Sequence, residues 1–85
     1  MSDVDAEFTQ AQQDVQAMSD DPGNEAKLKI YALYKQATSG DASGKKPGRF
    51  DMVGRAKYDA WSKVKGLSSD EAKQQYVDYA RSLGA

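Results

Sequence analysis

Histidine and cysteine are both absent from this 85-residue sequence. Without cysteine, the chain has no disulfide and no thiolate ligand for a metal. Without histidine, it lacks the side chain that most often serves as a general base or a metal ligand. No serine stands in a nucleophile-elbow motif, and the acidic residues lack the spacing of a calcium loop. We therefore expect no enzyme, no metal site and no cofactor.

Long apolar runs are missing as well. No stretch approaches the ~18 apolar residues of a membrane-spanning helix, so we expect no stable membrane insertion. The first residues, MSDVDAEF, are acidic and resemble neither a secretory signal nor an Arg-rich presequence. The expected location is therefore cytoplasmic. The length fits a single domain with a thin core, which we place over residues 1–85.

Charge is nearly balanced in sum but not along the chain. The net charge is −1, which argues against a nucleic-acid-binding protein. Residues 1–25 contain seven acidic side chains and no basic ones, whereas residues 26–65 contain ten basic side chains and three acidic ones. Charge segregation of this kind indicates a site for an anion in the basic middle of the chain.

Apolar residues recur at helical spacing in four segments and show no strand-like alternation. This periodicity predicts helices over about 3–18, 24–38, 52–65 and 69–83. Ser68 and Glu71 fit a capping box at the start of the last helix, and Asp51 can cap the third. Residues 39–50 hold three glycines and a proline and are expected to form a long loop. The predicted fold is all-α, a four-helix bundle with this loop between its second and third helices.

Basic and aromatic residues gather on the predicted helices. Tyr31, Tyr34 and Lys35 share one turn of the second helix, Lys57 lies on the third and Tyr76 on the fourth. Lysine and tyrosine can donate hydrogen bonds to phosphates, and tyrosine rings offer a flat surface to a purine. This set suits a phosphorylated adenine nucleotide, and it equally suits a single-stranded nucleic acid. Each residue taken alone is also compatible with ordinary packing or solvation.

Several short motifs of the sequence resemble those of the acyl-CoA-binding protein family. They are YALYKQATSGD at residues 31–41, KPG at 46–48, GRAKYDAW at 54–61 and KG at 65–66, in compatible order and spacing. The resemblance implies an up-down-down-up bundle and a non-catalytic carrier of medium- to long-chain fatty acyl-CoA esters. We further expect a monomer, because no apolar face is clearly left over, and no nucleic-acid partner, because the net charge is −1.

The resemblance extends to individual residues for the CoA head group. It implies that Tyr31, Tyr34 and Lys35 face the head group. Lys35 and Lys57 would meet the ribose 3′-phosphate. Tyr76 would contact the bound ligand from the last helix.

The resemblance also covers the acyl chain, and it has exceptions. Leu28 and Ala32 are expected near the acyl chain. The family commonly has basic residues where this chain has Gln16 and Val53, and often a tryptophan where it has Tyr58. The first two differences remove positive charge near the phosphates, although Val53 can offer apolar surface to the chain. The alternative hypothesis is a nucleic-acid or protein-interaction module that uses the same basic, aromatic segment.

Overall fold

The structure is a computed structural model, and it describes residues 3–85 of the chain. These residues form four amphipathic helices and the loops that connect them. The helices are α1 (Asp3–Gln16), α2 (Asn24–Ser39), α3 (Met52–Lys63) and α4 (Ser69–Ser82). No strand occurs in this part of the chain. The predicted all-α class and the long loop between α2 and α3 are therefore confirmed.

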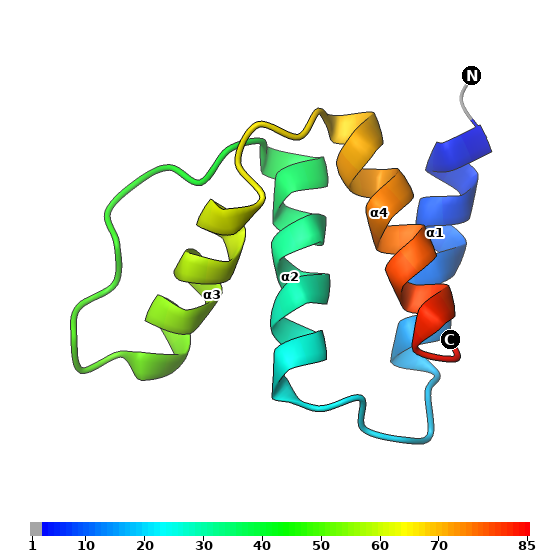
Figure 1. Cartoon of the computed structure of the whole chain (residues 1–85), viewed down its shortest axis with the longest axis horizontal. Helices are drawn as coiled ribbons and strands as arrows, with labels where there is room; N and C mark the ends of the chain where they lie inside the picture. Colours follow the sequence, from blue (N-terminus) through cyan, green and yellow to red (C-terminus); the bar gives the residue numbers. More distant parts are fainter. Residues whose placement is uncertain (1–2) are drawn as a thin grey trace.

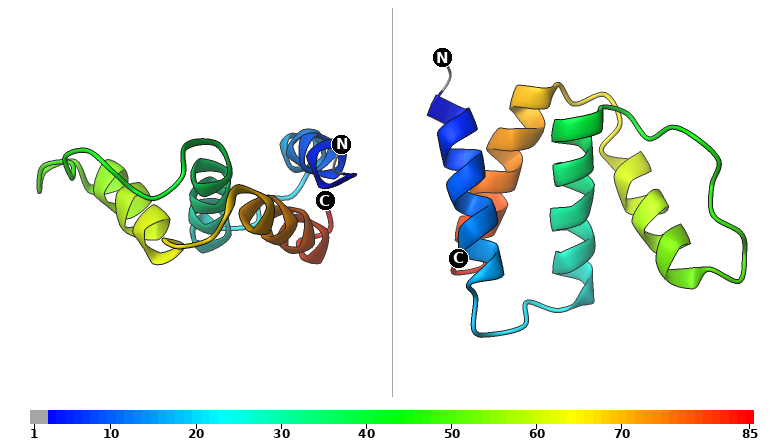
Figure 2. Two further views of the ribbon diagram at one scale, coloured as in Figure 1. Left: turned by 90° about the horizontal axis from the view of Figure 1, so that it is seen from above. Right: turned by 180° about the vertical axis from the view of Figure 1, so that it is seen from behind.

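The helices lie side by side in a flattened arrangement of about 38 × 31 × 15 Å. In Figure 1, α1 and α4 run downward, whereas α2 and α3 run upward, which agrees with the expected up-down-down-up order. The helix α2 packs against α3 and α4, and α1 packs against α4. Viewed from above in Figure 2, α3 lies at the edge opposite α1. Within residues 3–85, α3 therefore has only one helix neighbour.

The hydrophobic core lies between α1, α2 and α4. Leu33 and Val77 are almost completely buried, and each contributes roughly 1.5–3 kcal/mol by leaving water. The remaining core residues are mostly small, which lets the helices approach closely. The core cluster consists of Phe8, Ala11, Leu33, Ala37, Ala72, Tyr76, Val77 and Ala80.

Two helices end earlier than their apolar pattern predicts. The helix α1 ends at Gln16 rather than near residue 18, and α3 ends at Lys63 rather than near residue 65. Beyond both ends the backbone makes i→i−3 hydrogen bonds, such as Met18 N to Val15 O at 3.3 Å and Lys65 N to Ser62 O at 3.3 Å. These tighter turns satisfy the last carbonyls, so the apolar pattern continues for two residues past the helix.

The predicted helix caps are present. The Ser68 hydroxyl accepts a hydrogen bond from Glu71 N at 3.1 Å, and Ser68 N donates to the Glu71 carboxylate at 3.0 Å. This reciprocal pair is a capping box. The Asp51 carboxylate accepts from Gly54 N at 3.0 Å and begins α3. Local sequence therefore fixes where α3 and α4 start.

Asp41 joins the end of α2 to the connection between α3 and α4. Its carboxylate accepts from Gly66 N at 2.9 Å and from Gln36 Nε2 at 2.7 Å. These two hydrogen bonds, in that order, hold the pKa of Asp41 below its ordinary value. The buried Gln36 amide also donates to Leu67 O at 2.9 Å. The first residues of the long loop are thus held in place from both sides.

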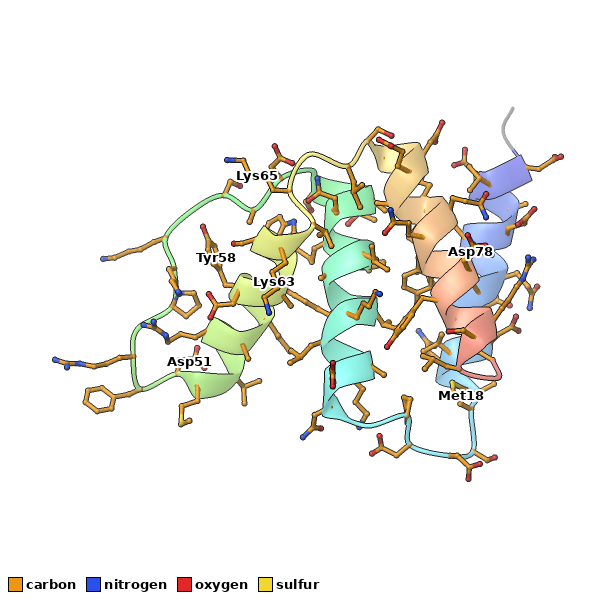
Figure 3. All side chains as sticks on the ribbon, viewed as in Figure 1. Met18, Asp51, Tyr58, Lys63, Lys65 and Asp78 are labelled. Atoms are coloured by element: carbon orange, nitrogen blue, oxygen red, sulfur yellow. The ribbon has the colours of Figure 1, made fainter. Side chains whose placement is uncertain are left out.

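The side chains of α3 hold the rest of the loop. Trp61 Nε1 donates to Gly40 O at 2.7 Å, and the Tyr58 hydroxyl donates to Gly44 O at 3.3 Å. Figure 3 shows Tyr58 on the side of α3 that faces the loop. Tyr58 and Trp61, the aromatic residues of the GRAKYDAW motif, therefore position both α3 and the loop before it.

Candidate functional site

A crossed pair of lysines joins α2 to α3. Lys57 Nζ, on α3, lies 5.2 Å from the ring centroid of Tyr31, on α2. Lys35 Nζ, on α2, lies 4.9 Å from the Trp61 ring on α3. Each ammonium group thus rests on an aromatic face of the opposite helix, an arrangement worth about 0.5–1 kcal/mol at exposed sites. The two predicted phosphate-binding lysines are brought to the same helix–helix boundary.

No carboxylate of the described residues neutralises either lysine of this pair. Within residues 3–85, ion pairs hold Lys27, Lys46 and Lys73, but none involves Lys35 or Lys57. Their positive charges are therefore free to meet an anion. Because ammonium groups are strong donors to phosphate oxygens, this boundary is suited to a phosphorylated ligand.

A groove of about 390 Å³ begins beside this boundary and continues between α1 and α2. The two helices that flank it, α1 in blue and α2 in cyan to green, can be followed in the right-hand view of Figure 2. Tyr31 belongs both to the groove and to the lysine pair, so the two features are continuous. Among the described residues, none with a carboxylate lines the groove. The lining residues are Gln12, Val15, Gln16, Pro22, Lys27, Ile30, Tyr31, Tyr34 and Tyr76.

Tyr76 contributes to both the core and the groove. Its side chain is 3% exposed and meets Phe8 edge-to-face, with the ring centroids 5.0 Å apart. Tyr34 stacks on the same Phe8 ring at 6.2 Å. Burial, with a smaller effect of the neighbouring Tyr34, raises the pKa of the Tyr76 hydroxyl, which therefore stays protonated at neutral pH.

The tyrosine hydroxyls of the groove are available to a ligand. Within the described part of the chain, the hydroxyls of Tyr31, Tyr34 and Tyr76 make no hydrogen bond, whereas that of Tyr58 donates to the loop. A hydroxyl that lines a groove without a partner can donate to a ligand oxygen. The groove therefore offers both hydrogen-bond donors and the apolar side chains of Val15, Pro22 and Ile30.

The structure gathers most of the predicted site residues, but not all of them. Gln16, Tyr31, Tyr34 and Tyr76 line one groove. Lys57 lies beside this groove through its contact with Tyr31, and Lys35 contacts Trp61 at the same α2–α3 boundary.

Three residues that were predicted to contact the ligand lie outside the first groove. Leu28 and Ala32 line a second groove of about 490 Å³ on another face of α2, together with residues of α3 such as Lys63, which is labelled in Figure 3. These two residues lie on the face of α2 that packs toward α3, whereas Ile30 and Tyr34 lie on the face toward α1. Val53 is 67% exposed at the start of α3 and lines neither groove.

Sequence reasoning missed several residues of the first groove. Ile30 lies at helical spacing from Leu33, Tyr34 and Ala37, and it is only partly buried against the core. Its position one turn before Tyr34 is a signal that it shares a face with that residue. Val15 and Pro22 carried no such signal, because they reach the groove only through the packing of α1 and its following turn.

Comparisons with known proteins place this architecture in a family. The sequence matches the family described as "Acyl CoA binding protein" over residues 5–80. The chain therefore belongs to the acyl-CoA-binding protein family. The match favours the acyl-CoA hypothesis over the nucleic-acid or protein-interaction alternative.

Individual relatives agree with this assignment. The chain is 40% identical over 82 residues to the acyl-CoA-binding protein homolog of Drosophila melanogaster, covering 96% of this chain and 95% of the relative. The crystal structure of Oryza sativa acyl-CoA-binding protein 2 superposes with a TM-score of 0.89 at 38% identity, covering 94% of this chain and 89% of that one. The chain is also 48% identical over 79 residues to enoyl-CoA delta isomerase 2 of Rattus norvegicus, covering 93% of this chain. It spans about a fifth of the isomerase's length.

Two further features bear on the site. In residues 3–85, no group of three or more acidic side chains is placed to hold a metal ion. No helix among the same residues has the length and apolarity needed to cross a membrane.

Proposed function

We propose that this domain binds medium- to long-chain fatty acyl-CoA esters and carries them without chemical change. The observation that carries the proposal is a pair of lysines beside a groove with apolar side chains. Among the described residues, these lysines, Lys35 and Lys57, have no ion-pair partner. A phosphorylated head group matches the lysines, and a hydrocarbon chain matches the groove. One ligand with both parts satisfies both features.

The head group is held at the α2–α3 boundary in this proposal. Lys35 and Lys57 neutralise the ribose 3′-phosphate, and the Tyr34 hydroxyl donates to another ligand oxygen. Because Lys57 Nζ lies 5.2 Å from the Tyr31 ring centroid, a phosphate on the lysine brings its own adenine close to that ring. Gln16 lines the groove without a charge, so the head group depends on the lysine pair more than in relatives with a lysine there.

The acyl chain lies along the groove between α1 and α2. Each buried methylene is worth about 0.8 kcal/mol, so ten of them offer roughly 8 kcal/mol before ordering costs are subtracted. Val15, Pro22 and Ile30 supply the apolar contacts. The head group thereby sets specificity and the chain sets affinity. Leu28, Ala32 and Val53 lie outside this groove and are not needed for this placement.

The domain acts by binding and release in this proposal. The sequence contains no cysteine and no histidine, so a thioester bound here meets neither of the two commonest attacking or proton-transferring groups. The isomerase relatives extend far beyond the region shared with this chain, and the proposal concerns that shared region alone. We further propose that the domain works as a monomer in the cytoplasm.

Calorimetric titration tests this function. Palmitoyl-CoA is expected to bind more tightly than free CoA and more tightly than palmitate, because only the ester engages both the lysines and the groove. The comparison separates the two contributions within one protein. If palmitate bound as tightly as palmitoyl-CoA, the role given to Lys35 and Lys57 would be wrong.

A further inference from the structure

Three large apolar side chains, close together in the sequence, are exposed where the long loop enters α3. Phe50 is 93% exposed, Met52 78% and Val53 67%. We call these three residues the apolar tip. Contiguous exposed apolar residues on a small domain commonly mark an interaction surface. None of the three lines either groove described above, so the proposed ligand site does not account for their exposure.

The apolar tip lies at a corner of the molecule. Asp51, which lies between Phe50 and Met52, is labelled at the lower left of Figure 3, on the side away from α1 and α4. Its carboxylate caps α3 by accepting from Gly54 N. The only acidic residue between positions 42 and 58 is therefore occupied by its own helix. The tip therefore lies at an outer edge of the molecule, away from α1 and α4 (Figure 3).

The surroundings of the tip are basic. Lys45, Arg49 and Arg55 flank it in the sequence, and none of them forms an ion pair with another residue of the 3–85 region. The Arg49 guanidinium lies 5.7 Å from the Phe50 ring centroid. An exposed aromatic residue is thus directly accompanied by an unneutralised positive charge.

We propose that the apolar tip and its basic residues dock the domain onto an anionic lipid surface. In this arrangement Phe50, Met52 and Val53 enter the boundary between head groups and acyl chains. Lys45, Arg49 and Arg55 contact the anionic head groups. Apolar side chains combined with cations are the pattern of interfacial membrane binding, and each basic residue near such a surface adds about fivefold to the affinity. The charge complementarity favours lipid over a protein partner.

The position of the tip relates it to the ligand site without depending on it. Lys57 follows Met52 by five residues, which is about 7.5 Å along a helix at ~1.5 Å per residue. Docking by the tip would hold the lysine pair close to the lipid surface. The docking itself requires no acyl-CoA, so it is tested with vesicles that contain none.

Co-sedimentation measures docking on phosphatidylcholine vesicles with and without 30% phosphatidylserine. Three variants of the full chain are compared: Phe50→Ser combined with Met52→Ser, Arg49→Glu, and Lys65→Glu as a control. The control makes the same charge change at the other end of α3, where Figure 3 labels Lys65. Because the substituted side chains are exposed, thermal melting is expected to stay close to that of the unchanged protein.

We expect the unchanged protein to sediment with the anionic vesicles and to be released by salt. The double variant should bind at least tenfold more weakly, and Arg49→Glu at least fivefold more weakly, whereas Lys65→Glu changes binding less than twofold. Absence of vesicle binding by the unchanged protein overturns the proposal. Equal binding by all four proteins overturns it as well. Self-association that the double variant abolishes, without vesicle binding, would assign the tip to a second copy of the chain instead.

Discussion

Removal of one ammonium group from the crossed lysine pair is the most direct perturbation of the proposed site. A hydrogen bond to a charged group contributes about 1.5–3 kcal/mol where it is well shielded, and much less where it is solvated. Lys57 is exposed and Lys35 is half-buried. We therefore expect Lys57→Ala to weaken acyl-CoA binding by about 1 kcal/mol, or fivefold, and Lys35→Ala by about 1.5 kcal/mol, or more than tenfold.

The assay is calorimetric titration with two ligands that differ by one phosphate. The first is palmitoyl-CoA, and the second is its analogue without the 3′-phosphate. If the lysines meet that phosphate, their substitution should weaken the first ligand and leave the second nearly unchanged. Lys63→Ala is the matched control, because Lys63 is a lysine of the same helix as Lys57 that lines the other groove.

Two results would refute this reasoning. Equal losses for Lys57→Ala and Lys63→Ala would show that general positive charge, rather than position, decides affinity. Equal losses for both ligands would move the lysine contacts away from the 3′-phosphate. Thermal unfolding of each variant without ligand separates these outcomes from a loss of fold.

The remaining predictions concern stability. Leu33→Ala should lower the free energy of unfolding by about 2–5 kcal/mol, measured by urea denaturation, because Leu33 is fully buried between helices; a loss below about 1 kcal/mol would contradict that packing. Asp41→Asn should reduce the acid sensitivity of the fold. The pKa of Asp41 is lowered in the folded state. The carboxylate therefore stabilises the fold fully above the pKa of the unfolded state, 3.8, and this stabilisation is lost as the pH falls through the pKa of the folded state. Urea midpoints between pH 2.5 and 6 check this, and an unchanged pH slope would refute it.

Local sequence was sufficient to predict most of the fold. The period of the apolar residues predicts four helices, and Ser68 and Asp51 cap α4 and α3 as their spacing indicates. These features depend on residues within one or two turns of each other. The ends of α1 and α3 were placed two residues too late, because an apolar pattern does not distinguish a last helical turn from the tighter turn that follows it.

The site was less predictable because it depends on how helices are rotated against one another. The sequence pattern placed Tyr31, Lys35 and Lys57 in a common site, and the structure has them at one boundary. It gave no means to know that Leu28 and Ala32 line a different groove. Leu28 and Ile30 are two residues apart, which is about 200° around a helix at ~100° per residue, so the packing of α2 against its neighbours decides which groove each face lines.

The acyl-chain side of the groove was hidden for a related reason. Val15 and Pro22 are far in sequence from Tyr34, and they meet it only across the space between α1 and α2. Neither residue has a chemistry that marks a binding site. Tyr76 was expected at the site from the family resemblance and on the apolar face of the last helix from its spacing, and the structure has it in the core.

The single helix neighbour of α3 has a consequence for how the domain opens. A helix held on one side can separate from α2 without disturbing the core between α1, α2 and α4, so it forms a unit of lower local stability. A ligand phosphate shared by Lys35 and Lys57 would tie this edge to the rest of the molecule. Amide hydrogens of α3 would then exchange more slowly in the bound state, while those around Leu33 would change little. Part of the ligand's binding free energy is thereby used to close the outer helix onto its neighbour.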